Sequence, residues 1–343
     1  MKLGQATIKD IARELNLSAS TISRALKDYP GISDETKRRV KEVAKNMNYR
    51  PNAIALSLRK SRSFTIGVII PEVVHFFFST VISGIEDIAQ SRGYNVILSQ
   101  SNEKLDREIS SIETMLSNQI DGVLVSYSKE TESFDHFTRV LDQGFPIVFF
   151  DRAPAIPNAI NVMVADYQGA YDATIHLISQ GYKNIVHLSG PKALKISIDR
   201  EQGYRDALEK NGISVNPANI IECPLGTLEE GQRLVSELFN SLPERPDAFF
   251  SCNDIGAVGA MKACRDIGLK IPLEVGIVGF SDWQFCAMLD PQLSSVSQPG
   301  FMMGARATEI LIDIIEKKLD VETMERNLIL ETKLMERDSS RRF

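Results

Sequence analysis

The chain has 343 residues, of which 43% are hydrophobic and 24% charged, a composition typical of folded globular proteins with two or three domains. It contains no run of about 18 apolar residues, which a membrane-spanning helix requires, and its start, MKLGQATIKD, lacks the apolar stretch of a signal peptide. We therefore expect a cytoplasmic protein without a membrane partner. Four cysteines without C-x-x-C spacing and four scattered histidines predict buried free thiols and no metal site.

Charge is distributed unevenly along the chain. Residues 1–63 contain 14 Lys and Arg against 6 Asp and Glu, a formal charge of +8, which leaves −14 on the remainder of a chain whose total is −6. A small basic segment joined to an acidic body is typical of a module that binds a polyanion such as DNA.

The basic segment predicts short helices that meet at a tight turn. Thr7 and Asp10 have the spacing of a capping box, and apolar residues then recur at helical spacing. Asn16 tolerates the left-handed backbone that a tight reversal requires, and Ser18 can cap a second helix. A third helix follows Ser33. This order predicts a helix-turn-helix unit, whose second helix enters the major groove of DNA.

The outward face of the second predicted helix carries small and basic side chains. Arg24 can donate two hydrogen bonds to a guanine. Ser20 and Ser23 can reach bases or phosphates, and Ala19 can offer apolar contact to a thymine methyl group. A helical hairpin with an ordinary polar surface is the alternative, and the charge of +8 favours DNA binding over it.

The segment after the third helix reads NYRPNAIALSLRKSRS. Asn52 can cap a helical stretch over residues 53–59, and helices shorter than about 12 residues are marginal in water. We expect this hinge to fold against its own copy in a second subunit together with DNA. Leu58 would then be an apolar wedge in a minor groove, with Arg59 beside phosphates. A solvated linker is the alternative.

The chain contains, in this order, the segments TIKDIARELNLSASTISRALK, YRPNAIALSLR and IGVIIP. Together they resemble the headpiece, hinge and first core strand of the LacI/GalR family of bacterial transcriptional regulators, and the resemblance extends over nearly the whole chain. It implies a homodimer that binds a near-palindromic operator in double-stranded DNA. Family members often carry larger residues at the positions of Ala19 and Ser20, so more of the sequence readout falls to Arg24 and to DNA shape. The residues expected to contact DNA are Thr7, Ser18, Ala19, Ser20, Thr21, Ser23, Arg24, Asn52, Ala55, Leu58 and Arg59.

From Phe64 onward, apolar runs alternate with amphipathic stretches, which predicts parallel sheets covered by helices on both faces. Similar segments around Gly93 and Gly212 indicate two α/β halves with a cleft between them. The expected strands are Ile66–Ile70, Asn95–Ser99, Gly122–Ser126, Ile147–Phe150, Asn161–Ala165, Ile185–Ser189, Ala248–Cys252 and Gly276–Phe280.

Ligands of open α/β sheets bind beyond the carboxyl ends of the strands, and polar residues stand at those positions. Asp151 and Arg152 follow one strand, and the segment HFFFS, residues 75–79, follows another. An apolar pocket with a few polar groups suits a small polar ligand. The alternative is that Asp151 pairs with Arg152 and that the phenylalanines belong to the core.

The family resemblance adds a ligand class and a domain plan. It implies a sugar or sugar derivative as effector, and the expected effector-binding residues are His75, Phe77, Phe78, Asp151, Arg152, Arg200, Asn253 and Asp282. The implied fold is a small all-α helix-turn-helix headpiece (1–50), a hinge helix and linker (51–63) and a two-lobed α/β core (64–338) like that of periplasmic binding proteins. Lobe one would comprise 64–164 and 297–326, and lobe two 165–296 and 327–338.

Two other classes of protein are weighed against a repressor. The sequence lacks P-loop, dinucleotide-binding, G-x-S-x-G and H-E-x-x-H motifs, so we expect no catalytic residue and no cofactor, although Asp151, Asp254 and Asp282 could gather as carboxylates. A sugar receptor of transport would share the two-lobed body, but such receptors are exported, and here a basic helical module stands in place of a signal peptide. The few polar residues at 339–343 predict a dimer without a tetramerising helix.

Overall fold

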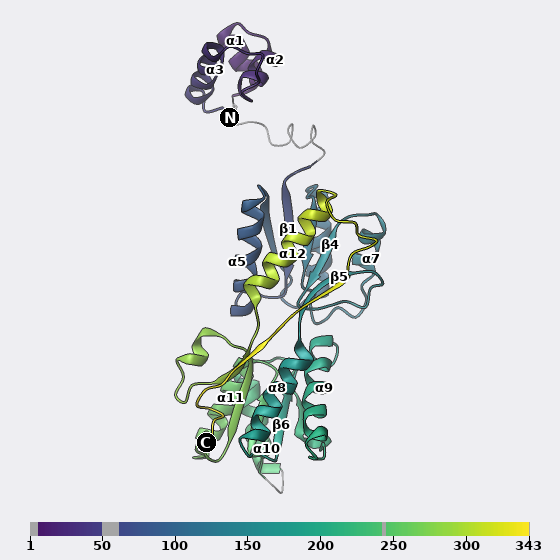
Figure 1. Cartoon of the computed structure of the whole chain (residues 1–343), viewed down its shortest axis with the longest axis vertical. Helices are drawn as coiled ribbons and strands as arrows, with labels where there is room; N and C mark the ends of the chain where they lie inside the picture. The colour runs from purple at the N-terminus through teal and green to yellow at the C-terminus, as the bar shows by residue number, and fades with distance from the viewer. Residues whose placement is uncertain (1–5, 50–61, 242–244, 343) are drawn as a thin grey trace. The chain divides into compact units, whose positions relative to one another are not determined.

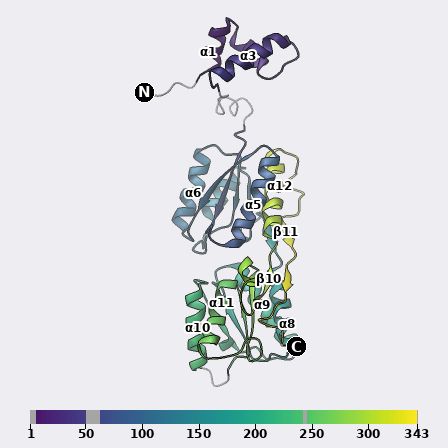
Figure 2. The same ribbon diagram turned by 90° about the vertical axis from the view of Figure 1, so that its left-hand side faces the viewer.

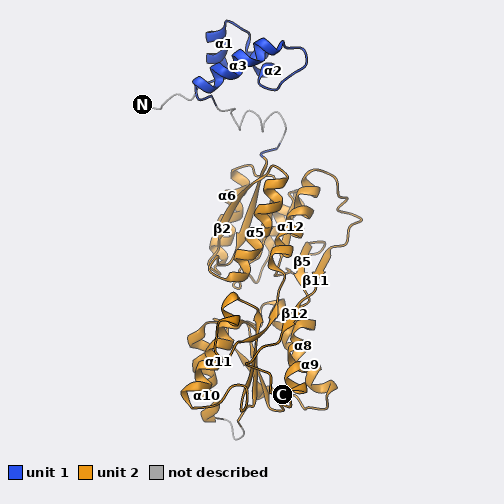
Figure 3. Ribbon diagram, turned by 60° about the vertical axis from the view of Figure 1, so that its left-hand side comes forward, with its two compact units in different colours: residues 1–63 blue, residues 64–343 orange. Residues whose placement is uncertain are grey.

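The computed structural model describes residues 6–49, 62–241 and 245–342. The chain divides into two compact units, Met1–Ser63 and Phe64–Phe343, which Figure 3 colours separately. We call the first the headpiece and the second the core. Within the described residues, no helix is both long enough and apolar enough to cross a bilayer.

Over residues 6–49, the headpiece consists of three helices around one small apolar cluster. They are α1 (Ile8–Leu15), α2 (Ala19–Ala25) and α3 (Asp34–Asn46). Ile11, Ile22 and Val40, one from each helix, are fully buried in the same cluster. Helices of this length are marginal alone in water, so each depends on packing against the other two.

The turn signals read from the headpiece sequence are confirmed. Thr7 and Asp10 form a capping box, in which Thr7 N donates to Asp10 Oδ2 at 2.9 Å. Asn16 has a φ of 50° and so takes the left-handed conformation that reverses the chain. The side chains of Ser18 and Ser33 cap α2 and α3. The predicted helix-turn-helix unit is therefore present.

The core consists of two lobes with one six-stranded sheet each, seen from two sides in Figures 1 and 2. The strands of lobe one are β1 (Thr65–Ile70), β2 (Asn95–Gln100), β3 (Gly122–Val125), β4 (Ile147–Phe150), β5 (Ile160–Val164) and β11 (Asn327–Leu330). Those of lobe two are β6 (Ile185–Ser189), β7 (Ile220–Glu222), β8 (Ala248–Ser251), β9 (Gly276–Ser281), β10 (Ser294–Ser297) and β12 (Lys333–Met335). The strand orders are β11-β5-β4-β3-β1-β2 and β12-β10-β9-β8-β6-β7, and the one antiparallel pair among the described strands is β10 with β12.

Helices cover both faces of each sheet, as the alternation of the sequence predicts. In lobe one, α5 (Phe76–Ser91) and α12 (Gly300–Ile315) pack on one face and α6 (Leu105–Ser117) and α7 (Asp135–Asp142) on the other. In lobe two, α8 (Asp166–Ser179) and α9 (Lys195–Lys210) lie opposite α10 (Leu228–Ser241) and α11 (Asp254–Asp266). Ile66, Val68 and Ile70 of β1 pack beneath α5 and α12, while Ile69 packs beneath α6, because side chains alternate along a strand.

All eight expected strands are present to within one residue at each end, and β7, β10, β11 and β12 are additional to them. β7 has only three residues. β10 reads SSVS, and its first two serines are buried and hydrogen-bonded. Ser295 Oγ donates to Asp254 Oδ1 at 2.5 Å, and Ser294 Oγ donates to the Arg337 carbonyl at 2.9 Å. A strand stabilised by such polar contacts carries no apolar pattern.

Three chain segments connect the lobes: β5 to α8, β10 to α12, and β11 to β12 (Figure 1). The last of them corrects the expected boundary, which assigned residues 327–338 to lobe two. β11 pairs in parallel with β5, placing Asn327 opposite Asn161 in the sheet of lobe one. Only β12 and the residues after it belong to lobe two, because the chain first adds an edge strand to one sheet and then crosses.

The close contact of α5 with α12 depends on residues without side chains. A Cβ atom at Gly84 would collide with the carbonyl of Phe301, and one at Gly304 with the carbonyl of Val81. The two backbones therefore approach more closely than any larger residue allows.

Gly84→Ala should lower the free energy of unfolding of the core by about 1–3 kcal/mol, because the added methyl group overlaps backbone atoms. This cost exceeds the gain of about 1 kcal/mol in helix propensity. Urea denaturation followed by circular dichroism measures the difference. Ser83→Ala, an exposed position on the same helix, is the control and should change stability by less than about 0.5 kcal/mol. Equal stability of Gly84→Ala and the parent chain would contradict the packing argument.

Candidate functional site

The exposed surface of α2 carries the side chains expected to read DNA. Ala19, Ser20 and Arg24 are exposed. Ser18 Oγ lies 2.8 Å from the hydroxyl oxygens of both Ser20 and Thr21, so three hydroxyl groups gather at the start of the helix. This surface can donate to and accept from phosphates or base edges.

Other residues of the headpiece that are expected to contact DNA are partly buried or already bonded within the headpiece. Ser23 is half-buried, and the Thr7 hydroxyl donates to Asp10 Oδ2 at 2.7 Å within the capping box. The Arg24 guanidinium lies 5.7 Å from the centre of the exposed Tyr29 ring. Asn52, Ala55, Leu58 and Arg59 lie outside the described residues, so their roles stay predictions.

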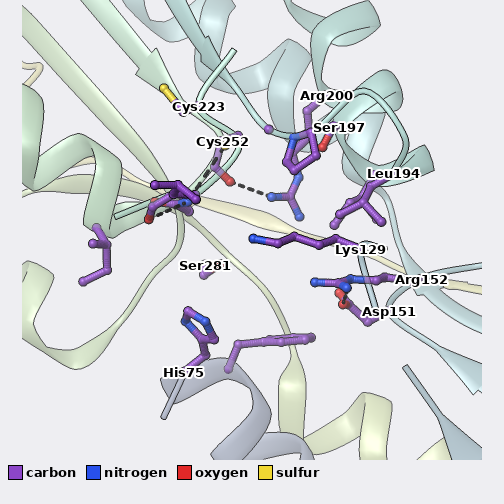
Figure 4. A pocket seen from close by; sticks show the side chains of 18 of the residues that line it. His75, Lys129, Asp151, Arg152, Leu194, Ser197, Arg200, Cys223, Cys252 and Ser281 are labelled. Carbon is purple, nitrogen blue, oxygen red and sulfur yellow. Dashed lines mark hydrogen bonds and ion pairs between the residues drawn. The ribbon is translucent and has the colours of Figure 1, made fainter. Parts of the chain in front are cut away.

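A cavity of about 170 Å³ lies between the two lobes (Figure 4). By the measure that allots about 15 Å³ to one water molecule, it has room for a small ligand. Its wall contains seven of the eight residues expected to bind an effector, and these are His75, Phe77, Phe78, Asp151, Arg152, Arg200 and Asn253. Lobe one supplies the first five, and lobe two supplies Arg200 and Asn253.

An aromatic wall follows the end of β1. Phe77 and Phe78 are 8% and 5% exposed, and their ring centroids lie 5.4 Å apart. Phe78 also contacts Phe150 of the sheet, at 6.4 Å between centroids. His75 reaches lobe two, where its ring lies 5.6 Å from that of Trp283. The phenylalanines therefore belong to the core of lobe one and to the cavity wall at once.

The acid and the base after β4 face different partners. The Arg152 guanidinium donates to both carboxylate oxygens of Glu103, at 2.8 and 2.9 Å, and to the Tyr127 carbonyl at 2.6 Å. Its Nε is 3.9 Å from Asp151 Oδ2, which is too long for a hydrogen bond. Burial raises the pKa of Asp151, against the cations of Arg152 and Arg200. The expected alternative, an Asp151–Arg152 pair, is present only as this long ion pair, because Arg152 donates its hydrogen bonds to Glu103 and Tyr127.

Arg200 is fixed by three groups of lobe two. Its guanidinium bonds to Asp166 Oδ1 at 2.7 and 2.8 Å, donates to the Cys252 carbonyl at 2.6 Å, and lies 3.7 Å from the centre of the Phe280 ring. A guanidinium that is bonded and stacked in this way is held in one orientation. Burial raises the pKa of Asp166 to about 6, although Arg200 opposes the shift.

The two polar residues after β8, Asn253 and Asp254, stabilise the local structure. Asn253 caps α11 by accepting from Gly256 N at 2.7 Å, and its amide donates to the Gly226 carbonyl at 3.3 Å. Asp254 is buried and accepts from Trp283 N at 2.8 Å, so it holds the loop after β9. Burial raises the pKa of Asp254 to about 7.

Both units match known families. A model of bacterial regulatory proteins of the lacI family matches residues 7–52, and a model of periplasmic binding proteins and the sugar binding domain of the LacI family matches residues 63–337. The chain belongs to the LacI family. Catabolite control protein A of Priestia megaterium is 34% identical over 314 residues, covering 91% of this chain and 93% of the relative.

Further similar proteins support the same assignment. The ribose operon repressor of Halalkalibacterium halodurans is 33% identical over 336 residues, covering 98% of this chain and 97% of the relative. A solved complex of the transcriptional regulator CelR with cellobiose has a TM-score of 0.73 and 25% identity, covering 98% of this chain and 100% of that one. Similarity to LacI-family proteins therefore includes headpiece and core together.

Asp282 is the expected effector residue that does not line the cavity. Its neighbours Ser281 and Trp283 do, but the Asp282 carboxylate pairs with Arg337 at 2.7 Å. Ser281 and Asp282 have φ values of 111° and 52°, a strained backbone for residues with side chains. The family pattern alone gives no sign of the Arg337 partner, which comes from the far end of the chain.

Part of the cavity wall was not predicted from the sequence. Glu103 and Lys129 line it, and they follow the ends of β2 and β3, where the strand-end rule would have found them. Ser197 and Gln298 also line it, but they come from a helix and a crossover segment. The predicted buried free thiols are confirmed for all four cysteines, of which Cys223 and Cys252 line the cavity.

The raised pKa of Asp254 predicts how the free energy of unfolding of the core depends on pH. Its pKa is raised from the ordinary value of 3.8 to about 7, so the folded core binds a proton more tightly than the unfolded chain does. This contribution is full below about pH 4 and is lost as pH rises to about 7. Between these pH values, the free energy of unfolding of Asp254→Asn should fall by less than that of the parent chain. The difference should be about 1 kcal/mol or more. Urea titrations at several pH values measure it, and identical slopes in both proteins would contradict the assignment.

Proposed function

We propose that this chain is a sequence-specific DNA-binding transcriptional repressor that binds its operator as a homodimer. A sugar or sugar derivative, bound between the lobes of the core, controls its operator affinity. The observation that carries the proposal is the joining of a LacI-family headpiece, residues 7–52, to a LacI-family sugar-binding domain, residues 63–337. Neither domain alone would allow a metabolite to control DNA binding.

The headpiece supports the DNA-binding half of the proposal. α2 exposes Ala19, Ser20 and Arg24 on one surface, and in helix-turn-helix proteins the second helix places such side chains against base edges. The charge of +8 over residues 1–63 supplies attraction to phosphates. Asn52, Ala55, Leu58 and Arg59 would add contacts at the operator centre.

The cavity supports the ligand-binding half. A ligand that contacts both lobes stabilises the closed arrangement and shifts the population toward it. Two contacts already connect the lobes across the cavity, the rings of His75 and Trp283 and the hydrogen bond from Lys129 Nζ to the Pro224 carbonyl at 3.3 Å. Closure would change the separation of the two chains at residues 62–64 of the dimer and so pair or melt the hinge helices.

A sugar receptor of transport is the second candidate for the core. It shares the sugar-binding domain, but the lacI-family match at residues 7–52 favours the regulator. The family consists of transcription regulators, and we assign this chain no catalytic residue and no cofactor. A gel-shift assay of the full chain with its own upstream DNA separates the candidates, because a transport receptor would leave that DNA unshifted.

Arg24→Ala should lose about 1–3 kcal/mol of discrimination at one base pair in each operator half-site, because a bidentate arginine contact is worth this much. Gel shifts with the operator and with single-base variants of it measure the loss. Lys27→Ala, at an exposed position just after α2, is the control and should weaken binding to all sequences alike. An unchanged base preference in Arg24→Ala would remove Arg24 from the reading surface.

Asp151→Asn should impair the response to ligand and leave operator binding without ligand unchanged. The substitution keeps the size of a buried cavity side chain but alters its charge and one acceptor. We expect at least a tenfold higher ligand concentration for the half-maximal change in operator affinity, about 1.4 kcal/mol. The ligand is taken from a thermal-shift screen of sugars, and a response equal to that of the parent chain would exclude Asp151 from the site.

A further inference from the structure

Both arginines that line the cavity are paired with a carboxylate, whereas Lys129 is not. Arg152 donates to both carboxylate oxygens of Glu103, and Arg200 bonds to Asp166 at 2.7 and 2.8 Å. These four charges cancel in two pairs. Lys129 Nζ forms no ion pair with any residue that the structure describes. One positive charge of the cavity wall is therefore left without a counterion.

The backbone around Lys129 is held in place by two carboxylates. Glu103 accepts from Lys129 N at 2.6 Å, and the fully buried Glu108 accepts from Ser128 N at 2.5 Å. From this loop the side chain extends into the cavity, as Figure 4 shows, and its ammonium donates to the Pro224 carbonyl of lobe two at 3.3 Å. A cation positioned before binding loses less conformational entropy when a ligand arrives.

The wall also contains N–H donors without acceptors. Arg152 Nε and Gln298 Nε2 are buried and have no hydrogen-bond partner among the described residues. Gln298 uses its amide oxygen to accept from Ser281 Oγ at 2.7 Å. Unmatched buried donors are costly, and ligand oxygens that accept from them would remove that cost.

We propose that the ligand of this cavity is a sugar carrying an anionic group, a phosphate or a carboxylate, and that Lys129 binds that group. The inference rests on the proposed function, in which the cavity holds a sugar. An anionic oxygen forms stronger, charge-assisted hydrogen bonds with an ammonium than a neutral hydroxyl does. On binding, it replaces the Pro224 carbonyl as the acceptor for Lys129 and remains within reach of both lobes.

The carboxyl groups of the wall do not oppose this assignment. Glu103 is neutralised by Arg152 and also accepts from the backbone of Lys129. Asp151 is buried, which raises its pKa against the cations of Arg152 and Arg200, and its carboxylate lies 3.9 Å from Arg152 Nε. Among the described residues, neither carboxyl group forms an ion pair with Lys129 Nζ.

Isothermal titration calorimetry on the full chain tests the proposal with matched probes. D-glucose, D-galactose and D-ribose are each compared with their terminal phosphate ester and with their sugar acid, and inorganic phosphate is titrated alone. At least one charged form should bind at least tenfold more tightly than its neutral parent, with an affinity that falls as salt rises. Whether the phosphate or the carboxylate form binds more tightly identifies the group.

Variants separate the charge of Lys129 from its bulk. Lys129→Met should raise the dissociation constant of the charged probe at least tenfold and that of its neutral parent less than threefold, while Lys129→Arg should retain most of the affinity. Lys262→Met, at an exposed position of α11, is the control and should bind as the parent chain does.

Several results would overturn the proposal: equal affinity for charged and neutral forms, binding of neutral sugars alone, no binding of any charged probe, or unchanged affinity in Lys129→Met. Gel shifts distinguish this failure from failure of the proposed function. If only a neutral sugar altered operator binding, the chain would still be a repressor, but the proposal of an anionic ligand would be wrong. If the chain bound a sugar phosphate tightly but shifted no DNA, the proposal of an anionic ligand would hold and the proposed repressor function would be wrong.

Discussion

The parallel pairing of the strands is the constraint on which the rest of the core depends. In a parallel sheet all carboxyl ends meet at one edge, so the residues after β1, β2, β3 and β4 gather at one end of lobe one and those after β6, β7, β8 and β9 at one end of lobe two. These two edges face the same cavity, since its wall contains Glu103, Lys129 and Asp151 from the first set and Asn253 and Trp283 from the second. Polar residues that would destabilise a sheet interior are harmless there.

The three crossings between the lobes are each bonded to the cavity wall or to the loop beside it. Asp166, directly after the first crossing, holds Arg200. Gln298, within the second, accepts from Ser281 Oγ at 2.7 Å. Arg337, after the third, pairs with Asp282 in the strained loop beside the cavity. In the proposed mechanism, a ligand that moves the wall would therefore act on these crossings through Asp166, Gln298 and Arg337.

Local signals in the sequence were enough for most of the architecture but not for the polar contacts between distant segments. Thr7, Asn16 and Ser18 carry their own turn chemistry, and the eight apolar strands carry their own pattern. β10 could not be found in this way, because Ser294 and Ser295 are buried only through hydrogen bonds to Arg337 and Asp254. The expected ligand role of Asp282 met the same difficulty, since its partner stands 55 positions later in the chain. Lys129 obeys the strand-end rule, yet a single lysine in a loop gives no sign that its charge will lack a counterion.

Control of DNA binding by this cavity requires a physical connection, because its wall consists of core residues only. That connection begins at Phe64, where the second unit starts. Phe64 N donates to Asp121 Oδ2 at 2.7 Å, and the Phe64 carbonyl accepts from Asn95 N at 2.8 Å, so the end of the linker is fixed to the sheet of lobe one. In the proposed mechanism, a rotation of lobe one upon closure would carry the end of the linker with it, and in a dimer it would change the distance between the two linkers. A ligand can shift this equilibrium only by binding one arrangement more tightly, and contacts divided between the two lobes give it that preference.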